Sequence, residues 1–308
     1  MYNKDDIYAS SDLGFATPEQ QYEYEKIAVQ EHTDRLKDEM TTVYDITHNF
    51  AEDPDGIKGL AVFGPPGIGK TEAVRDALND AKANFQYEKG ADISPAGFFG
   101  LLWFNRDPNR ILVLDDVDLN SGGQNAKSII ALLKSATENV FKPRTVSWIK
   151  AAPNRQMVEN HIPSSFDYWG NIIWITNETP DSLAEKKSTA KHFDALVGEG
   201  GRFTPANLDW DKKDKFLWTL HLINNEDMLG KKCRSRKGGY TKVIIKDTVD
   251  FLTREYPILR GITPRFATIV AHNRYRFPDK WERMSKFGNA MAVASGRNKK
   301  GTVNGRNK

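Results

Sequence analysis

Short strand-like segments alternate with helical patterns along the middle of the chain. Apolar runs and flanking turn residues predict four strands, at 59–63, 84–88, 111–114 and 171–176. Helices are predicted between them, over 70–83, from Ser94 and Pro95 through the apolar run 97–104, and over 126–138. Because strands and helices alternate at this spacing, the pattern indicates βαβ units and an α/β fold with a parallel sheet.

Three segments outside this alternation follow other patterns. Residues 18–40 predict a long, mostly polar helix that Thr17 caps and Pro18 begins. Residues 143–170 are rich in proline, turn residues and aromatic residues, which predicts strands or loops projecting from the sheet. Beyond Trp210 the chain predicts mainly helices. We therefore expect an N-terminal helical extension (1–52), an α/β domain (53–210), a helical lid domain (211–286) and a basic mobile tail (287–308).

A glycine-rich segment between the first predicted strand and helix fits the pattern G-x-x-x-x-G-K-[ST]. Glycines let backbone N–H groups turn toward phosphates, and the helix N-terminus adds positive potential. Lys70 would reach the β- and γ-phosphates, and the Thr71 hydroxyl would complete a Mg²⁺ shell. A chance glycine-rich turn is the alternative, which the flanking strand and helix disfavour. The predicted nucleotide-binding residues are Gly64, Pro65, Pro66, Gly67, Ile68, Gly69, Lys70, Thr71 and Glu72.

An acidic pair, Asp115 and Asp116, follows the apolar strand 111–114. The C-terminal ends of parallel strands lie at one edge of a sheet, so the pair is expected beside the glycine-rich loop. Asp115 would hold Mg²⁺ directly or through water, which makes Thr71 and Asp115 the predicted metal ligands. Asp116 could polarise an attacking water. The alternative is that Asp116 and Asp118 cap the next helix.

These motifs together resemble the AAA+ ATPase superfamily. The sequence GPPGIGKT, then ILVLDD, then a strand ending at Asn177 carry the resemblance, which covers about residues 55–275. The resemblance implies a P-loop parallel αβα sandwich of the AAA+ type with a small C-terminal helical lid, and hydrolysis of ATP with Mg²⁺. It also implies that Asn177 orients the lytic water. Residues 88–118 are similar to AAA+ proteins of large bacteriophages.

Two arginines match later positions of that family by order along the chain. Arg202, in GEGGRF, resembles the arginine finger that reaches the ATP of a neighbouring subunit and stabilises charge on the γ-phosphate. Arg265, in GITPRFATIVAHNR, resembles the sensor-2 arginine of the lid. A surface arginine and a structural salt bridge are the respective alternatives. The resemblance thus implies a homo-oligomer, with a hexameric ring as the first expectation, and catalytic roles for Asp116, Asn177, Arg202 and Arg265.

Some features leave the use of ATP open. The acidic pair is Asp-Asp where Asp-Glu is commoner, so Asp116 reaches less far and a slow, ATP-gated assembly switch is an alternative. Phe98, Phe99 and Gly100 have the composition of the pore loop of a protein unfoldase, although their apolar helix favours core packing. The 143–170 segment lies where some AAA+ proteins carry a β-hairpin that contacts DNA or protein. Packing against a neighbour is equally open.

The net charge of +3 conceals two basic clusters. One is a cluster of five cations at 231–237, and the other is the tail, which carries five more and no acid. Clustered cations favour salt-dependent contacts with phosphates, so DNA or RNA is an expected partner, against the alternative of a solvated surface. We therefore expect an ATPase that remodels or loads a nucleic-acid-associated complex, with a partner protein also open. The cluster at 231–237 consists of Lys231, Lys232, Arg234, Arg236 and Lys237.

Composition sets the expected compartment. No apolar run approaches the roughly 20 residues that cross a bilayer, and the N-terminus lacks the basic and apolar regions of a signal peptide. Cys233 is the one cysteine, so no internal disulfide forms. The six histidines show no metal-ligand spacing, so no metal besides Mg²⁺ is expected. We expect a cytoplasmic protein, in the host cytoplasm if it is viral, with no membrane partner.

Overall fold

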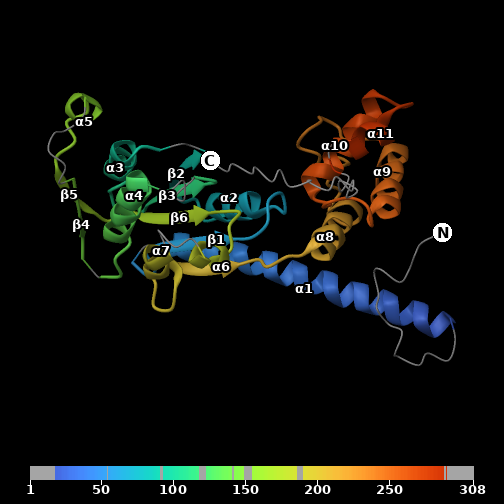
Figure 1. Cartoon of the computed structure of the whole chain (residues 1–308), viewed down its shortest axis with the longest axis horizontal. Coiled ribbons are helices and arrows are strands. Elements are labelled where there is room, and N and C mark those ends of the chain that lie inside the picture. The colour runs from blue at the N-terminus through green and yellow to red at the C-terminus, as the bar shows by residue number, and fades with distance from the viewer. Residues whose placement is uncertain are drawn as a thin grey trace, which may run out of the picture. The chain divides into compact units, whose positions relative to one another are not determined.

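The computed structural model describes residues 18–53, 55–90, 93–117, 123–140, 142–148, 155–185, 190–287 and 289 (Figure 1). They form two compact units that divide between Asp214 and Lys215. The predicted cap Thr17, the helix-cap alternative at Asp118 and the basic residues of the tail lie outside the described residues.

The first unit is built on a parallel sheet of five strands in the order β2-β3-β6-β1-β7. Strands that are neighbours in space are mostly not consecutive in the chain, so each crossover returns over a face of the sheet. The C-terminal ends of β1, β3 and β6 therefore meet at one edge, with Val62 and Asp115 both in register with Ile175. The strands are β1 (Gly59–Phe63), β2 (Asn84–Lys89), β3 (Arg110–Asp115), β6 (Asn171–Ile175) and β7 (Thr204–Asn207).

Helices flank this sheet and confirm the predicted α/β class (Figure 1). Helix α1 packs against α2 and β1, and α4 contacts both α3 and α7. The side chains of Leu112, Leu114 and Trp174 are buried in one cluster with residues of α3, α4 and α7. These helices are α1 (Pro18–Glu52), α2 (Lys70–Asp80), α3 (Pro95–Phe104), α4 (Gly123–Ala136) and α7 (Ala190–Val197), with the short α6 (Pro180–Glu185) before α7.

Helix α1 continues to Glu52 and is longer than the helix predicted over 18–40. Its second half buries one stripe of side chains at alternating spacings of four and three residues, which is the periodicity of a helix face. The part beyond residue 40 was not predicted because the stripe there includes a polar residue, Thr47, which is fully buried. Its members are Leu36, Met40, Val43, Thr47 and Phe50.

The 143–170 segment forms the predicted excursion. Strands β4 (Arg144–Ser147) and β5 (Ser165–Tyr168) pair antiparallel in a separate two-stranded sheet, with α5 (Arg155–Glu159) between them. The buried Arg144 guanidinium anchors the base of this hairpin by donating to the carbonyls of Tyr168 and Gly170, at 3.1 and 2.6 Å. A buried arginine with this structural role has no signal in the sequence.

Phe98 and Phe99 are fully buried in α3, and the Phe99 ring lies 5.0 Å from that of Phe166 on the hairpin. Core packing at these positions is therefore confirmed, and the pore-loop alternative is wrong. Strand β7 was not predicted. It is short, it contains Pro205, and it lies at the sheet edge where a missing N–H is tolerated.

The second unit is helical, as predicted. It contains α9 (Lys242–Glu255), α10 (Pro264–Arg276) and α11 (Trp281–Phe287), and most of α8 (Lys212–Asn224), whose first turn belongs to the first unit. Helix α10 packs against both α9 and α11. Thr241 and Thr263 cap α9 and α10 by accepting backbone N–H groups. None of the helices in the described ranges combines the length and the apolar character needed to cross a membrane.

Candidate functional site

The glycine-rich loop connects the end of β1 to the start of α2. Its glycines adopt positive φ angles, 145° at Gly64 and 110° at Gly69, which side chains rarely permit. A Cβ at Gly64 would lie 2.9 Å from the Leu208 side chain, so the backbone passes too close for any other residue. Gly69 caps α2 and Ile68 is fully buried beneath the loop. The loop therefore forms a cradle of fixed conformation at the N-terminus of α2. Helix N-termini are favourable binding sites for anions.

Lys70 lies within this cradle and is 5% exposed. Its Nζ donates to the carbonyls of Gly64 and Pro65, at 2.7 and 2.8 Å, and to Oδ1 of Asn177 at 3.0 Å. The last contact joins the loop to the end of β6. The ammonium is thus held over the loop, at the position where phosphate charge would need it.

Asp115, at the end of β3, is 2% exposed. Its Oδ2 accepts a hydrogen bond from Oγ1 of Thr71 at 3.0 Å, so the structure brings the two predicted Mg²⁺ ligands together. The same oxygen accepts a hydrogen bond from the phenol of Tyr87, and Nζ of Lys89 lies 3.8 Å away. Burial and the hydrogen bond to Asp115 raise the pKa of the Tyr87 phenol.

Asp116 leaves the sheet in a left-handed conformation with φ of 52°, and its carboxylate is exposed. Its N–H donates to the carbonyl of Ile175, and its Oδ1 accepts from Nδ2 of Asn177 at 2.6 Å. Asn177 therefore bridges Lys70 and Asp116. Two hydrogen-bonded sets at the sheet edge are linked through consecutive residues of the chain and together form a network of five predicted residues: Lys70, Thr71, Asp115, Asp116 and Asn177.

Glu72, Arg202 and Arg265 lie outside this network. Glu72, in the first turn of α2, lies 3.8 Å from Arg75. Arg202 precedes β7 and donates to the Ala195 carbonyl at 3.2 Å. A Cβ on Gly59 would contact the Arg202 carbonyl at 3.1 Å, which places this arginine beside the start of β1, whereas the glycine-rich loop follows its end. Arg265 is exposed in the first turn of α10, in the second unit.

Tyr87 and Lys89 are the residues that sequence reasoning missed. Both lie on β2, which runs parallel beside β3 with Lys89 in register with Asp115. Neither belongs to a motif. What could have indicated them is that two polar side chains lie at the end of β2, the strand beside β3 with its Asp115. That arrangement is recognised only when the order of strands in the sheet is known.

The donor set fits a nucleotide with Mg²⁺. The loop leaves no room for a side chain at position 64, and the ammonium of Lys70 lies within the cradle. The hydroxyl oxygen of Thr71 lies within hydrogen-bond distance of the Asp115 carboxylate. Within the described part of the chain, no group of three or more His, Cys, Asp and Glu side chains could hold a metal ion. Mg²⁺ typically combines one or two protein oxygens with substrate phosphates and water, which matches Thr71 and Asp115.

The chain is similar to curated proteins and to solved structures. No family model matches the chain. An uncharacterized 36.7 kDa protein in the nrdC-mobD intergenic region of Enterobacteria phage T4 is 34% identical over 145 residues, which are 46% of this chain and 42% of that protein. The chain thus spans less than half the length of this relative.

Two solved structures are among those to which the chain is similar. The Thermotoga maritima RuvB Holliday junction branch migration motor has a TM-score of 0.43 and 12% identity, covering 82% of this chain and 68% of that chain. The FIGL-1 AAA domain in complex with ADP has a TM-score of 0.39 and 16% identity, covering 79% and 73%.

The identification of the fold depends on this chain's own geometry. A glycine-rich loop joins β1 to α2, and a buried aspartate ends β3. Strand β6 lies between β1 and β3, and Asn177 follows its end and contacts the lysine of the loop. A phosphate loop, an aspartate strand and a parallel five-stranded sheet between helices give the first unit the fold of a P-loop nucleotide-binding domain.

Proposed function

We propose that this protein binds MgATP at the 64–71 loop and hydrolyses it at the subunit interfaces of a homo-oligomer. The observation that carries the proposal is the network in which Asn177 hydrogen-bonds to both Lys70 and Asp116. It joins a phosphate-binding cation to an exposed carboxylate through a neutral amide. A lysine and an aspartate that form a structural ion pair need no amide between them, whereas a water beside a phosphate has to be positioned by such a polar group.

Each residue of the network has a distinct role in this proposal. Lys70 neutralises charge on the β- and γ-phosphates, and Thr71 with Asp115 holds Mg²⁺. The metal ion, when bound, draws charge from the phosphate oxygens. Asp116 is the general base. Its Oδ1 is used by Asn177, and we assign its Oδ2 to the attacking water.

Arg202 completes the site from another subunit. Because it lies beside the start of β1, at the opposite end of that strand from the loop, it can act only on the nucleotide of a neighbour. Arginine at that position would stabilise charge that develops on the γ-phosphate. We assign Arg265 to a phosphate contact from the second unit, which would couple that unit to the nucleotide state.

We predict that Arg202→Ala reduces ATPase activity by about 10³-fold or more, the effect of removing an arginine finger. Mixing it with Lys70→Ala should restore part of the activity, since mixed oligomers contain interfaces with one intact loop and one intact arginine. Steady-state phosphate release against mixing ratio measures this. If the mixtures release no more phosphate than the separate variants at any ratio, while light scattering shows that mixed oligomers form, a shared site is contradicted.

The charge of the second unit favours nucleic acid as a partner. Residues 215–289 carry sixteen Lys and Arg against seven Asp and Glu. Lys231 and Lys237 are exposed, and the Arg236 guanidinium lies 3.8 Å from the centre of the Tyr275 ring, which holds the basic loop against α10. Cations beside accessible aromatic rings suit single strands, whose phosphates and bases bind to the two kinds of group.

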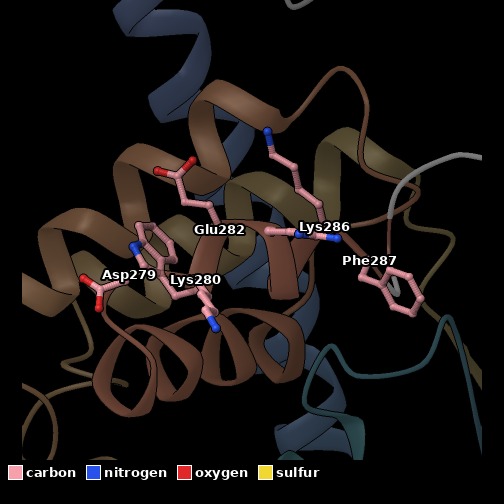
Figure 2. A pocket seen from close by; sticks show the side chains of 7 residues that line it. Asp279, Lys280, Glu282, Lys286 and Phe287 are labelled. Atoms are coloured by element: carbon pink, nitrogen blue, oxygen red, sulfur yellow. The ribbon is translucent and has the colours of Figure 1, made fainter.

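Helix α11 lines a pocket of about 740 Å³ in this unit. Figure 2 shows Lys280 and Lys286 beside it, together with the acids Asp279 and Glu282 and the ring of Phe287. Phe287 is 94% exposed, which is rare for so large an apolar side chain. We propose that single-stranded nucleic acid is the partner whose complex this ATPase remodels or loads.

The double variant Lys231→Glu/Lys237→Glu should weaken binding to a fluorescent oligo-dT. The slope of log affinity against log salt concentration should become shallower by about 0.7 for each lost phosphate contact. Lys26→Glu/Lys37→Glu on α1 changes the charge equally at exposed positions and serves as the control. An equal loss of oligo-dT affinity in both variants would indicate a general charge effect. Unchanged affinity in Lys231→Glu/Lys237→Glu would exclude the cluster at 231–237 as a nucleic-acid contact.

A further inference from the structure

Three donors converge on one buried oxygen. Oδ2 of Asp115 accepts from Oγ1 of Thr71 and from the phenol of Tyr87, while Nζ of Lys89 lies 3.8 Å away. Thr71 and Asp115 are the proposed metal ligands, so Tyr87 is a hydrogen-bond partner of a ligand without being a ligand. The proposed mechanism gives it no role.

The surroundings of Tyr87 hold its phenol in this place. The residue lies on β2 in register with Val113, two positions before the pair of Lys89 and Asp115. The Arg75 guanidinium lies over its ring, 5.0 Å from the ring centre, in cation–π contact. Because Arg75 is on α2, the helix that begins at Lys70, the ring is held between the strand and the phosphate-loop helix.

We propose that Tyr87 is a positioning residue of the Mg²⁺ site, which fixes the plane of the Asp115 carboxylate for metal binding. This inference rests on the proposed function. A carboxylate rotates about its Cβ–Cγ bond, and a donor on one oxygen limits that rotation. Partners of metal ligands are typically worth about 10- to 100-fold in metal affinity. Without the phenol, the Thr71 hydroxyl and the nearby Lys89 ammonium are the remaining restraints on Oδ2, so the Asp115 carboxylate turns more readily.

The test is Tyr87→Phe, which removes the hydroxyl and keeps the ring beneath Arg75. Tyr44→Phe is the matched control, because the Tyr44 hydroxyl donates to the Asp80 carboxylate at 2.7 Å outside the phosphate-loop network. Binding of a fluorescent ATP analogue is measured with EDTA and then across a Mg²⁺ titration. Thermal unfolding of each variant confirms that it is folded.

For Tyr87→Phe we expect unchanged nucleotide affinity in EDTA and a Mg²⁺ midpoint raised about 10- to 100-fold. Tyr44→Phe should match the wild type in both measurements. A merely structural role of Tyr87 would lower the affinity in EDTA and leave the Mg²⁺ midpoint in place.

Other outcomes separate this inference from the proposed function. If the wild type binds no nucleotide at any Mg²⁺ concentration, the proposed function fails. If the wild type shows Mg²⁺-dependent binding and Tyr87→Phe has the same midpoint, the inference fails and the function stands. A lower midpoint would mean that the phenol competes with the metal for Asp115, which also overturns the positioning role.

Discussion

Asp116→Asn is expected to reduce the rate of ATP hydrolysis by about 100- to 10,000-fold, the usual contribution of a general base, while ATP binding is retained. The amide keeps an oxygen that can accept from Asn177, so the bridge to Lys70 survives. Asparagine also tolerates the left-handed conformation that Asp116 adopts, with φ of 52°. The loss of activity should therefore report chemistry and not unfolding.

The control is Asp227→Asn, which makes the same change at another positive φ, 56°, outside the network. Phosphate release, ATP affinity and thermal unfolding are measured for both variants. A wild-type hydrolysis rate in Asp116→Asn would show that Asp116 is not the base. If the wild type itself binds ATP without turnover, and light scattering shows ATP-dependent assembly, the protein is a nucleotide-gated switch.

The local parts of the site follow from the sequence. Strand Gly59–Phe63 was predicted to the residue, because its apolar run ends at a glycine that begins the phosphate loop. Asp115 could be placed at a strand end for the same reason. In both cases the signal is contained in a few consecutive residues.

The network between these parts could not be predicted in full. Asn177 bridges Lys70 and Asp116 because β6 lies between β1 and β3, although it follows both in the chain. Tyr87 reaches Asp115 for a similar reason, as β2 is the other neighbour of β3. Sheet order depends on packing between distant segments, and a single sequence carries little of that information. The end of α1 was missed because Thr47, a polar residue, is fully buried in its apolar stripe.

Lys70→Ala should reduce ATPase activity by about 10²- to 10⁴-fold, since hydrogen bonds to charged groups are worth about 1.5–3 kcal/mol each and Lys70 reaches two phosphates. The substitution also leaves the Gly64 and Pro65 carbonyls without their donor, so the fold needs its own control. Lys58→Ala provides it, because Lys58 is a similarly buried lysine, 7% exposed, just before β1 at the opposite end from the loop. Isothermal titration with ATP should show binding to Lys58→Ala and severe weakening in Lys70→Ala. Equal ATP affinity in the two variants would mean that the 64–71 loop is not the nucleotide site, and the roles of Thr71, Asp115 and Asp116 would fall with it.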